Sequence, residues 1–260
     1  MSFEAGFPST DVASISSAGL SKAACADLIS RVFCHQVFVT GFVHCDPHPA
    51  NVMLRRGKDG GPAVVLVDHG LYKSLAPDFR GTYCDFWLSI VTADVPFMKK
   101  TCEKLNAGEM FPLLAAMVTA RPFDEVLDRR AAGAMIFGGG KVKKRRRLKQ
   151  NRKGGKGGDS AMLRHYAVKY MGAILKLLED VPRDLPLLLK MNDCLRHIDH
   201  ELGRRRNDNL KACAGAASRG RMEAVLKSAR ASLLQKFKAY LRHWLLLARV
   251  RLLFGFLLRS

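Results

Sequence analysis

The sequence predicts a mainly helical α+β domain with one small β-hairpin. Two short apolar runs, residues 52–54 and 63–67, flank the turn-forming stretch 58–62 (Lys-Asp-Gly-Gly-Pro), which is typical of a hairpin. Elsewhere apolar residues recur at helical spacing, as in Ala24, Leu28, Ile29, Val32 and Phe33. Hydrophobic residues make up 48% of the 260 residues, enough for a sizeable core.

Two helices are expected before the hairpin. The first is short and covers residues 11–16. The second begins after Ser21, whose hydroxyl can cap the first turn, and continues to about Val39. Gly41 ends this helix because glycine readily adopts the left-handed conformation that closes a helix.

Helices are expected to dominate after the hairpin. Asp94 can cap one of them, with Pro96 in its first turn. Phe86 and Trp87 fall in the apolar pattern and are assigned to the core, whereas the basic run 204–206 (Arg-Arg-Arg) after Gly203 indicates an exposed helix end. The predicted helices cover residues 75–91, 94–106, 111–120, 160–179 and 185–203.

The main functional signal is the motif at residues 44–51 (His-Cys-Asp-Pro-His-Pro-Ala-Asn) with Asp-His-Gly at 68–70. An aspartate, an asparagine five residues later and a second aspartate beyond a hairpin have the spacing of a kinase-like phosphoryl-transfer site. Such a site positions the acceptor and neutralises phosphate charge, usually through Mg²⁺, which prefers oxygen ligands. The pattern therefore favours phosphoryl transfer.

Residues 41–72 resemble the UbiB/ADCK (aarF-domain-containing) family of atypical kinases, whose signature reads HxDPHPGN followed by a D-[FH]-G turn. Residues 1–6 resemble the hinge segment of that family, and residues 189–199 resemble a helix near the end of its C-lobe. The resemblance implies a protein-kinase-like C-lobe in which the small hairpin carries the catalytic loop, with the N-lobe missing. It also implies a role in quinone or lipid metabolism, with partner proteins from those pathways, and a mitochondrial or plastid location inside the cell.

The resemblance implies ATP and Mg²⁺ as cofactors and gives each motif residue a role. Asp46 would be the catalytic base, and His44 would brace the loop. Asn51 and Asp68 would bind Mg²⁺ and, with Gly70, the nucleotide.

This sequence departs from the family pattern in two ways. The glycine before the asparagine is Ala50 here, which would cost about 1 kcal/mol if that position requires a positive φ. Upstream of Gly41 we find no counterpart of the family's Lys-x-Gly-Gln helix, alanine-rich nucleotide loop, strand lysine or helix glutamate. We therefore predict that residues 1–260 alone turn over little ATP and are a fragment of a longer enzyme. The alternative is a non-catalytic pseudokinase or interaction module that binds a membrane surface or a partner protein.

Other interpretations of the motif remain open. One alternative is a metal site made of His44, Asp46 and His48, because residues at alternate positions share one face of a strand. However, Pro47 and Pro49 disfavour a regular strand here. A solvated, proline-rich turn would leave the spacing of the asparagine and the second aspartate unexplained. Nothing around Cys45 indicates the lowered thiol pKa of a nucleophile.

Charge is concentrated in one segment of the chain. The net charge is +20, and residues 141–156 contain ten Lys or Arg and no acid. We interpret residues 136–159 as a disordered basic insertion between residues 1–135, the core with the motif, and 160–221, the remaining helices. An anionic surface is a possible partner of the insertion. Binding of single-stranded nucleic acid is not expected, because no aromatic residues interleave with the basic ones.

Residues 222–260 are predicted to form one long, basic, amphipathic helix. It either packs on the domain or lies on an anionic membrane surface. A transmembrane span is not expected, because the longest charge-free run near the end, 252–258, has seven residues against the ~20 required. Seven scattered cysteines without C-x-x-C spacing indicate reduced thiols. The apolar stripe comprises Leu226, Leu233, Leu234, Phe237, Leu241, Trp244, Leu245, Ala248 and Leu252.

Overall fold

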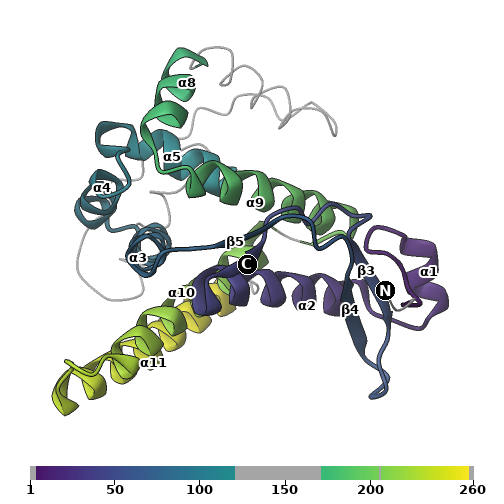
Figure 1. Cartoon of the computed structure of the whole chain (residues 1–260). Helices are drawn as coiled ribbons and strands as arrows, with labels where there is room; N and C mark the ends of the chain where they lie inside the picture. The colour runs from purple at the N-terminus through teal and green to yellow at the C-terminus, as the bar shows by residue number, and fades with distance from the viewer. Residues whose placement is uncertain (1–3, 121–170, 205, 258–260) are drawn as a thin grey trace, which may run out of the picture.

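The computed structural model describes residues 4–120, 171–204 and 206–257, which form helices and two small antiparallel sheets, with the hairpin 52–66 at one edge of the molecule (Figure 1). The predicted basic insertion 136–159 lies outside these residues, as does much of the predicted helix 160–179. The helices are α1 (Val12–Ser17), α2 (Lys22–Cys34), α3 (Pro77–Thr92), α4 (Val95–Glu103), α5 (Phe111–Thr119), α8 (Met171–Asp180), α9 (Asp184–Glu201), α10 (Arg206–Lys227) and α11 (Leu233–Leu257).

Several helix ends are where the sequence predicts them. The Ser21 hydroxyl accepts a hydrogen bond from the Ala24 amide, and an Asp94 carboxylate oxygen accepts one from the Phe97 amide at 3.1 Å. The helix that starts at Lys22 continues beyond Cys34 as a π-helical turn, η1 (His35–Thr40). Gly41 then ends it with a φ of 74°.

The predicted hairpin is confirmed, but it is part of a larger β structure. Strands β3 (Val52–Arg56) and β4 (Pro62–Leu66) pair with Val52 opposite Leu66. Strand β1 (Phe7–Pro8) joins the other edge of β3, and β2 (Phe42–His44) pairs separately with β5 (Tyr72–Ser74). These three extra strands were not predicted, because runs of two or three residues are too short to show an alternating pattern.

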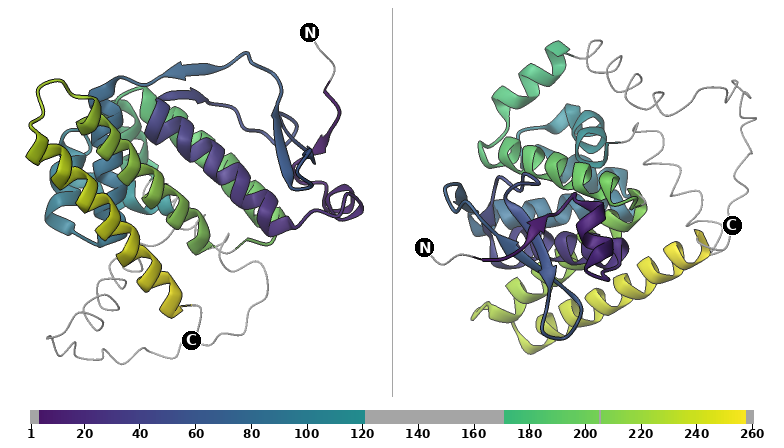
Figure 2. Two further views of the ribbon diagram at one scale, coloured as in Figure 1. Left: turned by 90° about the horizontal axis from the view of Figure 1, so that it is seen from below. Right: turned by 90° about the vertical axis from the view of Figure 1, so that its right-hand side faces the viewer.

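Helix α10 is the centre of the helical packing. It contacts α2, η1, α3 and α11, and Figure 2 shows α10 and α11 side by side beneath the rest of the domain. Gly220 allows the closest approach, because a Cβ at this position would overlap the Phe38 carbonyl of η1. The predicted core residues Phe86 and Trp87 are 0% and 3% exposed.

The prediction of one helix beginning at Met222 is wrong. Helix α10 continues through Lys227, and α11 begins only at Leu233. A reciprocal cap starts α11: the Ser232 hydroxyl accepts from the Gln235 amide, and the Gln235 side chain accepts from the Ser232 amide. This Ser-x-x-Gln capping box is a sequence signal for a new helix start.

The prediction that the basic run at 204–206 is an exposed helix end is wrong for Arg204. Its side chain is only 8% exposed and forms ion pairs with Asp27 of α2 and Asp199 of α9. It also donates to the carbonyl of Ala26. Arg204 therefore joins the end of α9 to α2, a contact between residues nearly 180 positions apart that local charge patterning cannot predict.

Candidate functional site

The two sheets bring both halves of the motif together. Strand β2 leads into the loop 45–51, and its last residue, His44, pairs with Tyr72 of β5, just after the Asp-His-Gly turn. On the other side, the Val67 amide donates to the Asn51 carbonyl at 3.0 Å, which continues the β3–β4 ladder by one step. The residue before Asp68 is therefore paired with Asn51 across the hairpin.

His44 holds the backbone of the loop 45–51 in place. Its ring is fully buried, and its Nδ1 accepts a hydrogen bond from the Asp46 amide at 3.2 Å. Its own amide donates to the Gln36 side chain of η1 at 3.0 Å. The ring packs edge-on against Tyr72, with centroids 5.1 Å apart. These contacts suit a bracing residue, because the ring fixes the backbone of Asp46.

Asn51 is tied to the backbone of Asp46. Its Nδ2 donates to the Asp46 carbonyl at 3.2 Å, so the amide oxygen Oδ1 remains available as an acceptor or metal ligand. Ala50 does not have a positive φ, so the strain considered for alanine at this position does not arise.

Asp68 has an uncommon backbone conformation for a non-glycine residue. Its φ is 58°, in the left-handed region that aspartate tolerates better than most residues. Its Oδ1 accepts a hydrogen bond from the Gly70 amide at 3.2 Å, and the side chain is exposed. A Cβ on Gly70 would lie 3.1 Å from the same oxygen, so glycine keeps this turn tight.

The residues present fit a partly hydrated Mg²⁺ ion. Mg²⁺ usually takes one or two protein oxygen ligands and completes its shell with water and substrate phosphates. Asn51 Oδ1 and the Asp68 carboxylate are oxygen donors of this kind. Across the described residues there is no cluster of three or more His, Cys, Asp or Glu side chains that could hold a metal. His48 Nδ1 accepts from the Ala50 amide, so the alternative of a His–Asp–His site gains no support.

Cys45 is not a nucleophile in this environment. Its side chain is fully buried, and burial raises the pKa of the thiol above its ordinary value, with a further rise from the Asp184 carboxylate. The thiol therefore stays protonated at neutral pH, whereas nucleophilic attack needs the thiolate.

Sequence reasoning missed the contribution of α9. Lys190 Nζ lies 3.1 Å from Asp46 Oδ1, and Asp184 pairs with Lys73 of β5 at 3.0 Å. Burial raises the pKa of the Cys194 thiol, one turn after Lys190, and the Asp46 carboxylate raises it further. One side of α9 therefore faces the loop 45–51. Lys190 lies within the segment 189–199 noted for its family resemblance, but no spacing rule links it to Asp46.

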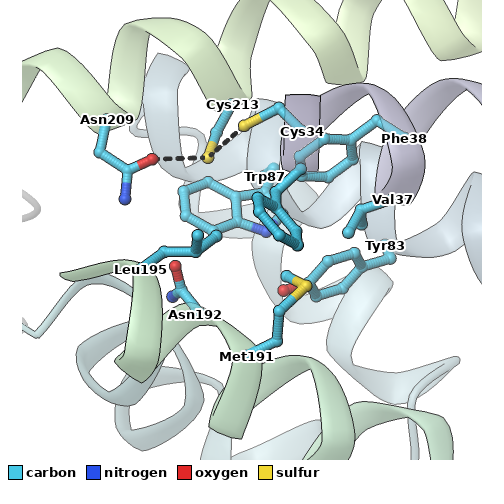
Figure 3. Close-up of a pocket in the computed structure, with 11 residues that line it drawn as sticks. Cys34, Val37, Phe38, Tyr83, Trp87, Met191, Asn192, Leu195, Asn209 and Cys213 are labelled. Atoms are coloured by element: carbon cyan, nitrogen blue, oxygen red, sulfur yellow. Dashed lines mark hydrogen bonds between the residues drawn. The ribbon is translucent and has the colours of Figure 1, made fainter. Parts of the chain in front are cut away.

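A small pocket between η1, α3, α9 and α10 is part of the core. Figure 3 shows its lining by aromatic and aliphatic side chains of η1, α3 and α9, with Cys34 and Cys213 at one end. The two sulfur atoms are 3.6 Å apart, and the Cys213 thiol donates to Asn209 Oδ1 at 3.4 Å. The residues of the motif do not line this pocket, so it is separate from the candidate site.

Comparison with known proteins identifies the family. Residues 1–102 match the model of the ABC1 atypical kinase-like domain. The chain is 37% identical over 178 residues to AarF domain-containing protein kinase 1 of Mus musculus, covering 68% of this chain and 30% of that protein. The same kinase of Gallus gallus is 34% identical over 206 residues, covering 78% and 35%. AarF domain-containing kinase 1 of Drosophila melanogaster is 35% identical over 194 residues, covering 74% and 34%.

The chain therefore belongs to the ABC1, or AarF domain-containing, atypical kinase family, as the motif at 44–51 and 68–70 indicates. It spans about a third of the length of these relatives. No solved structure matches it significantly.

Proposed function

We propose that this chain carries the metal-binding and catalytic-base residues of a kinase-like C-lobe that transfers phosphate from Mg-ATP. The main support for the proposal is a pair of hydrogen bonds around Asn51: its Nδ2 donates to the Asp46 carbonyl, and its carbonyl accepts from the amide of Val67, the residue before Asp68. The names of the relatives, which call them kinases, agree with this chemistry.

Each residue has a defined task in this proposal. The Asp46 carboxylate orients the acceptor hydroxyl and takes its proton as the oxygen attacks the γ-phosphorus. The bond from the γ-phosphorus to the bridging oxygen breaks, and ADP leaves with that oxygen. Bound Mg²⁺ neutralises charge on the phosphates, and Asn51 and Asp68 are the residues that would hold it. His44 keeps the Asp46 backbone in position.

Asp68→Asn tests the proposal by titration calorimetry with Mg²⁺ and a non-hydrolysable ATP analogue. Asparagine tolerates a positive φ, so the turn is retained while the metal-binding charge is lost. We expect the affinity for the Mg-analogue to fall at least tenfold. Asp59→Asn is a matched control, because Asp59 is exposed in the hairpin turn and, like Asp68, accepts a hydrogen bond from the amide of a glycine two residues later, Gly61.

Three results would contradict the proposal: binding that does not depend on Mg²⁺, equal affinity in the Asp68 variant, or no binding by the wild type. The last would favour the alternative of a non-catalytic interaction module.

We also propose that α11 attaches the domain to an anionic membrane surface. No helix in the described part of the chain is long and apolar enough to cross a bilayer. However, α11 exposes a stripe of large apolar side chains, while His243 and Val250 on another face are buried. Lys236, Lys238 and Arg242 lie close to that stripe in the sequence, as in helices that bind anionic lipid. The exposed stripe comprises Leu233, Leu234, Phe237, Tyr240, Leu241, Trp244 and Leu245.

Vesicle sedimentation tests this second proposal. Phe237→Ser with Trp244→Ser should release the protein from vesicles containing phosphatidylserine, whereas Leu226→Ser on α10 should not. Equal sedimentation of all variants, or equal binding to neutral vesicles, would contradict it. The family resemblance further leads us to propose a mitochondrial or plastid location and a role in quinone or lipid metabolism.

A further inference from the structure

Lys190 places a positive charge beside the loop 44–51, which has no lysine or arginine of its own. Lys190 of α9 reaches this loop from outside and places its Nζ 3.1 Å from Asp46 Oδ1. The proposed catalytic base therefore has a cation beside it that comes from a helix well over one hundred residues further along the chain.

The backbone around Lys190 is well anchored. The Asn192 side chain donates to the Val118 carbonyl of α5 at 2.7 Å, and Leu188 and Ile198 are fully buried. The ion pair between Asp184 and Lys73 fixes the start of α9 to β5. The position of the Lys190 Cα is thus set by contacts that do not involve its own side chain.

The ion pair between Lys190 and Asp46 contributes little to the stability of the fold. The side chains of Lys190 and Asp46 are 57% and 35% exposed, and pairs in such surroundings contribute about 0–1 kcal/mol. A lysine carries a compact charge on a flexible stem, so its ammonium can contact a carboxylate and a phosphate oxygen together. Phosphoryl transfer requires positive groups at this point, because charge spreads over the oxygens of the transferring group.

We propose that Lys190 binds the terminal phosphoryl group of the nucleotide while remaining beside Asp46. This inference rests on the function proposed above and adds to it a residue from outside the motif. The site would then distinguish a nucleoside triphosphate from a diphosphate through a single side chain of α9.

The test compares the affinities of the wild type and Lys190 variants for Mg-AMPPNP and Mg-ADP by titration calorimetry. Lys190→Ala should weaken binding of the triphosphate analogue about tenfold, as expected for one hydrogen bond to a charged group. Affinity for Mg-ADP, which lacks the terminal phosphoryl group, should stay within twofold. Lys190→Arg should restore most of the preference for the triphosphate. Lys176→Ala, which removes an exposed lysine of α8, is the matched control and should change neither affinity.

The outcomes separate the two proposals. If Lys190→Ala weakens binding of Mg-AMPPNP and Mg-ADP equally, Lys190 has a structural role; if it weakens neither, Lys190 has no role in binding. Either result overturns the inference about Lys190 but leaves the proposed function standing, provided that Asp68→Asn still loses binding. No Mg-nucleotide binding by the wild type would overturn both proposals together. Circular dichroism of each variant checks that the domain keeps its helix content.

Discussion

The candidate site and the packing around α10 are built from different kinds of contact. At the site, polar groups close in sequence hold one another: Asp46 with His44, Asn51 with Asp46, and Gly70 with Asp68. Around α10, small buried residues such as Ala217 and Gly220 let helices from distant parts of the chain approach closely. The comparison teaches that site variants should lose ligand binding with little loss of stability. Variants in α10 should instead lose stability and affect ligand binding little.

The largest expected effect on stability is that of Gly220→Ala. The added methyl group would overlap the Phe38 carbonyl, which is backbone and cannot simply rotate away. Overpacking of this kind costs about 3 kcal/mol. Urea unfolding should show this loss, while Gly215→Ala in the same helix should be neutral or stabilising, because its nearest neighbour lies at 3.7 Å. Equal stabilities of the two variants would mean that α10 does not pack closely against η1.

A smaller loss in the free energy of unfolding is expected for Arg204→Ala. The side chain is nearly buried between Asp27 and Asp199, and its removal leaves these carboxylates without a shared cation. Because Asp27 is half-exposed, we expect a loss of about 2 kcal/mol, below the 3–5 kcal/mol typical of a fully buried pair. Arg31→Ala removes an exposed partner of the same Asp27 and should cost less than about 1 kcal/mol. Unfolding curves that show equal losses for both variants would contradict the central role of Arg204.

The smallest effect concerns pH and the contact between α10 and α11. Burial lowers the pKa of His243, with a further lowering by the charge of Arg219, and its Nδ1 lies 2.9 Å from the Ser218 hydroxyl. The unfolded chain therefore binds this proton more readily than the folded one, and stability falls as the pH drops from about 6.5 through the lower folded pKa.

The measurement is the difference in melting temperature between the wild type and His243→Gln from pH 8 to pH 5. The wild type should lose its advantage over His243→Gln on acidification. A flat difference for His243→Gln would show that the buried ring does not resist protonation.

The sequence predicted those features that depend on neighbours a few residues away. The caps at Ser21 and Asp94, the helix end at Gly41 and the hairpin β3–β4 are all local, and the structure confirms them. The break between α10 and α11 was also encoded locally, in the capping box of Ser232 and Gln235, but the strong apolar pattern on both sides masked it.

Other features could not be predicted from spacing. The pair of Lys190 with Asp46, the burial of Arg204 and the approach of Gly220 to Phe38 all join residues that are distant in the sequence. Each depends on the arrangement of whole helices, which no local pattern specifies. For the same reason the sequence suggested the proposed metal ligands, Asn51 and Asp68, but not Lys190 beside the proposed catalytic base.

The most direct test of the central claim is to locate the metal–nucleotide complex by NMR. Mn²⁺ with the ATP analogue should broaden the amide signals of residues 46–51 and 68–70 first, and Asp68→Asn should remove this effect. Unaffected signals in these two segments, or stronger broadening elsewhere on the domain, would contradict the assignment of Asn51 and Asp68 as the metal site.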